Sequence, residues 1–130
     1  MLDGSTLTEL QLDILRVLWD QGEATTQDVH DALASTRGLA PTTVSTLLSR
    51  LEKKGILAHR RQGRQHVYRP LVDEGQVRRS KVRGLTDALF GGDSAALVSH
   101  LVRSDDIDEA ELARIRQLLD DRTRDEERGE

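Results

Sequence analysis

Residues 41–70 read PTTVSTLLSRLEKKGILAHRRQGRQHVYRP, and this stretch decides the fold. Pro41 favours the start of a helix because its fixed φ suits the first turn, and Gly55 provides a C-terminal stop. After the glycine, Gln62-Gly63 marks a turn between two short strands, and Pro70 ends the second strand. A helix followed directly by a short β-hairpin is therefore predicted. The apolar residues of the helix recur at helical spacing on one face: Val44, Leu47, Leu48 and Leu51.

Helical patterns lie on both sides of this stretch. Thr8 can cap a helix that runs to about Asp20, because Gln11 follows three residues later as in a capping box, and Gly22 stops it. A second helix is predicted to begin at Thr25 or Thr26. After the hairpin, three more helices are predicted from their N-cap residues. The caps are Asp73 for the first helix, Asp93 or Ser94 for the second and Asp108 for the third.

The order of three helices, a hairpin and three helices predicts a mainly α protein with a small β-hairpin wing. We expect a winged helix-turn-helix domain over residues 1–72, followed by C-terminal dimerisation helices over residues 73–124. Residues 125–130 form a charge-dense tail, for which we expect disorder. The second predicted helix carries an apolar stripe of Val29, Ala32 and Leu33.

The charge distribution points to nucleic acid, although the whole chain carries a net charge of −4. From Arg37 to Arg69 there are eight basic residues and a single acid, Glu52, which gives +7. From Arg103 to Glu130 the net charge is −5. The segment with the predicted helix and hairpin is thus the basic one, as DNA contact requires.

The predicted helix at residues 41–53 carries short hydroxyl side chains near its N-terminus, where the helix dipole favours a phosphate. The hairpin carries basic side chains around the flexible Gly63, which suits a wing on the phosphate backbone or in the minor groove. Solvated surface is the alternative interpretation of either feature taken alone. The predicted DNA-binding residues are Thr42, Thr43, Ser45, Thr46, Ser49, Arg50, Lys53, Arg60, Arg61, Arg64 and His66.

The C-terminal helices carry apolar stripes but too few large residues for a separate monomeric core. We therefore expect a homodimer, and its two-fold symmetry predicts a palindromic operator. Packing back onto the N-terminal domain is the alternative. The predicted dimerisation residues are Leu85, Leu89, Leu97, Leu101, Leu112, Ile115, Leu118 and Leu119.

Several other classes of function lack their sequence signals. The chain has no cysteine, and its four histidines show no metal-ligand spacing, so we expect no metal site and no cofactor. It has no phosphate loop, nucleophile elbow or HExxH motif, which argues against an enzyme. A winged helix used only for protein–protein contact would not need a basic wing. With no secretory signal and no long apolar run, the expected location is the cytoplasm, without membrane insertion.

Four segments carry a family resemblance. The LxxLW pattern at Leu15–Trp19, TTQDVHDAL, APTTVSTLLSRLEKKGIL and GRQHVYRPLV together resemble the penicillinase repressor family, which includes BlaI, MecI and the copper-responsive CopY branch. The resemblance covers roughly residues 7–119. It implies a dimeric repressor on a palindromic operator, often of β-lactam resistance genes. It also implies that Thr42, Thr43, Ser45, Thr46 and Arg50 read the operator, and that Arg61, Arg64 and His66 make the wing contacts.

Two departures from the family pattern concern the signal. The copper-responsive branch uses C-terminal cysteines, which this chain lacks. The β-lactam repressors are cleaved by a membrane sensor protease at an Asn-Phe pair, and His100-Leu101 stands at the corresponding place. Two routes of release therefore stay open: cleavage by such a protease, or a small ligand or partner protein acting on a repressor of another stress regulon.

Overall fold

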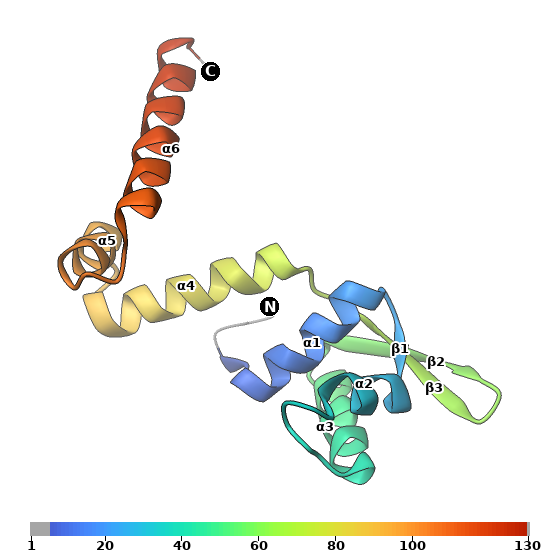
Figure 1. The fold of residues 1–130 in the computed structure, drawn as a ribbon. Coiled ribbons are helices and arrows are strands. Elements are labelled where there is room, and N and C mark those ends of the chain that lie inside the picture. The colour runs from blue at the N-terminus through green and yellow to red at the C-terminus, as the bar shows by residue number, and fades with distance from the viewer. Residues whose placement is uncertain (1–5, 130) are drawn as a thin grey trace. The chain divides into compact units, whose positions relative to one another are not determined.

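The computed structural model describes residues 6–129. Figure 1 shows the predicted order of helices, hairpin and helices, so the expectation of a mainly α chain with a small wing is confirmed. Within residues 6–129, no helix is both long and apolar enough to span a bilayer. The elements are α1 (Glu9–Gln21), β1 (Ala24–Thr25), α2 (Thr26–Leu33), α3 (Pro41–Lys53), β2 (Leu57–Gln62), β3 (Gln65–Pro70), α4 (Glu74–Phe90), α5 (Ser94–Arg103) and α6 (Glu109–Glu127).

The chain divides into two compact units, the first ending at Leu85 and the second beginning at Thr86. The division falls inside α4, whereas we expected the boundary after residue 72. The start of α4 belongs to the first unit because Val77 is buried in its core together with Val72. The indole Nε1 of Trp19 also donates a hydrogen bond of 2.9 Å to the Val72 carbonyl, which fixes the chain entering α4.

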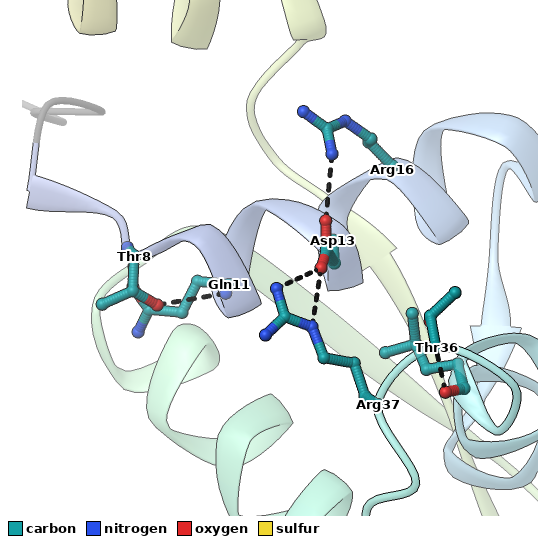
Figure 2. A network of polar contacts seen from close by, with 7 residues as sticks. Thr8, Gln11, Asp13, Arg16, Thr36 and Arg37 are labelled. Atoms are coloured by element: carbon teal, nitrogen blue, oxygen red, sulfur yellow. Dashed lines mark hydrogen bonds and ion pairs between the residues drawn. The ribbon is translucent and has the colours of Figure 1, made fainter.

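Side-chain caps set the helix starts as the sequence predicts. The Gln11 amide donates to the Thr8 hydroxyl at 3.1 Å, and the Gln11 side chain accepts from the Thr8 amide at 2.9 Å, which completes a capping box (Figure 2). Thr25 forms the same arrangement with Asp28 at α2. Asp108 caps α6 in the same way. These local pairs satisfy backbone donors that the first turn leaves unpaired.

The core of the first unit is mainly aliphatic, with Tyr68 as its buried aromatic residue, and lies between α1, α2, α3 and the sheet. The α3 side chains Val44, Leu48 and Leu51 are completely buried in it. The α2 helix buries only Val29 and Leu33. Ala32, expected in the same stripe, is exposed, because this eight-residue helix needs only a narrow apolar face. The buried α1 residues are Gln11, Ile14, Leu15 and Leu18.

The sheet has three antiparallel strands in the order β1-β3-β2. The pairing of Arg61 with His66 and of Gln62 with Gln65 closes the hairpin, and Gly63 adopts the positive φ of 65° that the turn needs. The two-residue strand β1 was not predicted. It pairs Ala24 with Tyr68, which anchors the base of the hairpin to the helices that precede it.

In the second unit, neither α5 nor α6 contains a buried residue. Helix α6 continues to Glu127, three residues into the segment for which we expected disorder. Ion pairs one turn apart explain the extension, because Arg122 pairs with Glu126 at 3.3 Å and Arg124 with Asp121 at 2.7 Å.

Candidate nucleic-acid interface

Helix α3 separates two chemistries on opposite faces. Val44, Leu48 and Leu51 are buried in the core, and this fixes the rotation of the helix about its axis. Leu47, predicted on the same face, is only half-buried. Thr46 Oγ1 donates a hydrogen bond of 3.0 Å to the Thr42 carbonyl, so that hydroxyl is held along the helix. All of the predicted contact residues of this helix are exposed: Thr42, Thr43, Ser45, Thr46, Ser49, Arg50 and Lys53.

A groove with a volume of about 450 Å³ lies between the N-termini of α2 and α3 and the tip of the hairpin. We call it the wing groove. Two helix N-termini meet here, and both present partial positive charge and short hydroxyl side chains, which suits an anion. The residues that line it are Thr25, Thr26, Gln27, Pro41, Thr42, Ser45, Arg64, Gln65 and His66.

The wing groove brings together four of the predicted contact residues, Thr42 and Ser45 from α3 with Arg64 and His66 from the hairpin. The sequence did not predict the residues at the start of α2, its N-cap Thr25 with Thr26 and Gln27, nor Pro41 and Gln65. Thr25 and Thr26 were predicted only as alternative starts of the second helix. Their place beside the wing depends on how α2 packs on α3, for which the sequence pattern carries no signal.

Arg60 does not join the other wing residues. Residues alternate between the faces of a strand, so Arg60 points to the side opposite from its neighbour Arg61. Its Nη2 lies 2.6 Å from Glu23 Oε1. The hydrogen bond from Arg60 lowers the pKa of Glu23, and the same bond raises the pKa of Arg60. The structure therefore places Arg60 as a tether between the hairpin and the loop after α1.

Arg37 is also engaged within the protein. Figure 2 shows its guanidinium against Asp13 of α1, with Nε and Nη2 donating to the same oxygen at 2.9 and 2.6 Å. Asp13 in addition accepts a hydrogen bond of 2.9 Å from Arg16. The contact ties the loop between α2 and α3 to α1.

The six other cations of the basic segment differ from Arg37 and Arg60. Each is exposed, and within residues 6–129 none of them forms a salt bridge. They can therefore meet an external anion without first breaking an internal ion pair. They are Arg50, Lys53, Lys54, Arg61, Arg64 and Arg69.

Two histidines stack on the face of the hairpin that carries Arg61. The rings of His59 and His66 lie 4.2 Å apart with an interplanar angle of 13°. His59 Nδ1 lies 2.5 Å from Oε2 of Glu52 on α3. In the part of the chain that the structure describes, no cluster of three or more His, Asp or Glu residues is arranged to hold a metal ion.

The sequence and this architecture match known repressors. The model of the family described as penicillinase repressor matches residues 7–121. The penicillinase repressor of Bacillus licheniformis is 28% identical over 115 residues, which cover 88% of this chain and 90% of that protein. The transcriptional regulator BlaI of Mycobacterium tuberculosis is 36% identical over 110 residues, or 83% and 80% of the two chains.

Among solved structures, the chain resembles the solution structure of the DNA-binding domain of the repressor BlaI. That match has 35% identity and a TM-score of 0.50, and it covers 57% of this chain and 90% of the other. The family match extends from the winged helix through α5 and most of α6. On this evidence the chain belongs to the penicillinase repressor family.

Proposed function

We propose that this protein is a transcriptional repressor that binds a palindromic operator as a homodimer. The observation that carries the proposal is the wing groove, where two helix N-termini and the basic hairpin tip converge on one surface. Relatives over most of the chain are named as repressors, which agrees with this use of the surface. Such a surface needs no catalytic group, and we propose no enzymatic activity.

In this proposal α3 enters the major groove of the operator. An α-helix fits that groove, and short hydroxyl side chains let the backbone approach the base edges closely. Thr46 and Arg50 are placed to contact bases, while Thr42 lies where a phosphate meets the helix N-terminus. Arg61, Arg64 and His66 contact the backbone beside it. Arg60 serves to orient the hairpin rather than to touch DNA.

The dimer contact is assigned to the second unit. Helices α5 and α6 bury none of their own side chains, and the chain leaves large apolar residues in solvent. Leu89 is 67% exposed, Leu118 65% and Leu119 60%. A second copy of the same surface would cover these residues symmetrically, and the two reading helices would then face two related half-sites.

The salt dependence of DNA binding tests the DNA-binding part of the proposal. Affinity for a mixed-sequence duplex should fall steeply as salt rises, because each phosphate contact releases counterions. Arg64→Ala should weaken binding to every sequence by about 1 kcal/mol and reduce the salt slope by about one. Thr46→Ala should instead alter sequence preference in a selection from a random duplex library. Arg116→Ala, which removes an exposed arginine of α6, is the charge-matched control. Salt-independent binding would exclude the phosphate contacts.

Sedimentation measures the dimer directly. The double substitution Leu118→Asp and Leu119→Asp should give a monomer at concentrations where the parent chain is a dimer, since it introduces charge into the apolar face. Ala113→Asp adds a charge on the opposite side of the same helix and should leave the dimer intact. A parent chain that sediments as a monomer would contradict the assignment.

For release from DNA, we propose a small ligand or a partner protein rather than cleavage by a membrane sensor protease. His100 and Leu101 both lie inside the helix α5. This pair replaces the Asn-Phe pair at which the β-lactam repressors are cleaved, and that difference in sequence supports release without cleavage. An intact chain in host cells during derepression would support release without cleavage. Fragments ending at residue 100 would support the protease.

A further inference from the structure

Glu52 is the single acid in the basic segment, and the proposed DNA contacts do not involve it. The structure places its carboxylate 2.5 Å from His59 Nδ1. The His59 ring lies in turn 4.2 Å from that of His66, nearly parallel to it. His66 lines the wing groove. A continuous line of side chains thus joins a carboxylate on α3 to the proposed position of a DNA phosphate.

The tautomer of His59 follows from its partner. An ionised carboxylate only accepts hydrogen bonds, so Nδ1 of His59 must carry a proton and donate it to Glu52. The stacked rings also argue against a metal site, because parallel rings direct their in-plane nitrogen lone pairs side by side rather than toward one ion. The arrangement places one carboxylate, that of Glu52, at the His59 end of the stacked pair, and the wing groove at the His66 end.

The groups around His66 include two arginines, whose positive charge a bound phosphate would offset. Arg61 is its cross-strand partner, and Arg64 lies beside it in the groove. The rings of His59 and Tyr68 contact it from the same sheet face. The lining residues from α2, its N-cap and α3 are uncharged: Thr25, Thr26, Gln27, Pro41, Thr42 and Ser45. Two carboxylates lie near this surface: Glu52 contacts His59, and Asp28 accepts a hydrogen bond of 3.0 Å from the amide of Thr25, which lines the groove.

We propose that Glu52, His59 and His66 make the wing a proton-linked phosphate clamp, in which His66 contacts DNA in its protonated form. This inference rests on the proposed function, since the anion is a phosphate of the operator backbone. His59 is a positioning residue. Its ring stacks on that of His66 and holds it in place, and it lies between His66 and the negative charge of Glu52. The clamp makes DNA occupancy sensitive to pH in the range where imidazoles change charge.

The direction in which DNA affinity changes with pH follows from the linkage between proton binding and DNA binding. A phosphate in the groove offsets the repulsion from Arg61 and Arg64, so the complex holds more protons than the free protein. Affinity therefore rises as pH falls through the range of imidazole titration. One proton taken up per subunit limits the rise to about tenfold per pH unit for each half-site.

Fluorescence anisotropy with a mixed-sequence duplex of about 30 base pairs, long enough for two half-sites, tests the clamp between about pH 6 and 8 at fixed salt. The parent chain should bind more tightly toward pH 6. His66→Gln, which retains hydrogen bonding, should remove most of this dependence. Glu52→Gln should move the rise to lower pH, because it takes away the negative charge that favours the protonated pair. His100→Gln, outside the winged helix, is the matched control and should behave like the parent.

Calorimetry in two buffers of different ionisation enthalpy counts the protons directly. The parent chain should take up protons, at most one per subunit, on binding the same duplex near neutral pH, and His66→Gln should take up markedly fewer. Equal uptake in parent and His66→Gln, or tight binding that does not change with pH, would overturn the clamp and leave the repressor assignment standing. Absence of DNA binding at every pH and low salt would overturn the repressor assignment and the clamp with it.

Discussion

Arg37 tests whether a basic residue of this segment stabilises the fold or contacts DNA. Its charge belongs to the basic segment, yet its guanidinium bonds Asp13 through two nitrogens at 2.9 and 2.6 Å. Arg37→Ala should therefore reduce stability and leave the salt slope of DNA binding unchanged. Arg64→Ala should do the reverse, since Arg64 lines the wing groove and forms no salt bridge with a described residue.

The expected loss of stability in Arg37→Ala is estimated from the burial of the Asp13–Arg37 pair. The side chains are 24% and 35% exposed, so they are covered more than an ordinary surface pair. Exposed ion pairs contribute about 0.2–1 kcal/mol, and hydrogen bonds to charged groups about 1.5–3 kcal/mol. We expect a coupling of about 1 kcal/mol. With a urea dependence of about 1–3 kcal/mol per molar, the unfolding midpoint of Arg37→Ala should fall by roughly 0.5 M.

A double-mutant cycle isolates this pair. Urea unfolding of Asp13→Ala, Arg37→Ala and the double variant is followed at one protein concentration, because dimerisation makes stability depend on concentration. The contact of Asp13 with Arg16 is lost in both variants that lack Asp13, so it cancels in the coupling energy. A coupling near zero together with a salt slope reduced by one would show that Arg37 contacts phosphate, and the structural reasoning would be wrong.

Three further outcomes follow from single contacts. Leu48→Ala should lower the free energy of unfolding by about 2–5 kcal/mol in a urea titration, because this side chain of α3 is completely buried in the core. Trp19→Phe should cost about 1 kcal/mol in the same titration, since the ring remains but the Val72 carbonyl loses its 2.9 Å donor. Because Arg60 lowers the pKa of folded Glu23, this pair contributes stability above the ordinary glutamate range, and the contribution is lost as pH falls through the folded-state pKa. Unfolding followed from about pH 7 to 3 should show a shallower acid loss for Glu23→Gln than for the parent.

The fold could be predicted where the determining contacts are local. Thr8 with Gln11 and Asp108 with Glu111 lie three residues apart, so the sequence itself displays both capping boxes. The helical spacing of the apolar residues likewise predicts which face of α3 is buried. The end of α6 was predicted too early, because composition suggested a frayed tail while ion pairs such as Arg122–Glu126 extend the helix.

The features that could not be predicted depend on partners far along the chain. Strand β1 has only two residues, and it exists because Ala24 meets Tyr68 from the hairpin. Arg37 lies 24 residues from Asp13, and Arg60 lies 37 residues from Glu23. A charge count over the segment treats these arginines like Arg64. Only the packing of α1 against the loop and the hairpin shows that two of the eight bases already have partners.

The acids near the proposed DNA surface have a common place in the architecture. Asp13 holds the loop before α3, Glu23 holds one face of the hairpin through Arg60, and Glu52 holds the other face through His59. Each acid lowers the net positive charge, which by long-range electrostatics alone weakens attraction to DNA. Each also fixes an element that carries contact residues, and a fixed geometry is what turns general attraction into selective contact. Because both faces of the hairpin are pinned, the tip with Arg64 and His66 is held beside the N-terminus of α3. The basic residues of the segment without a salt bridge attract the DNA backbone, whereas Arg37 and Arg60, which are paired with acids, hold the contact surface in its geometry.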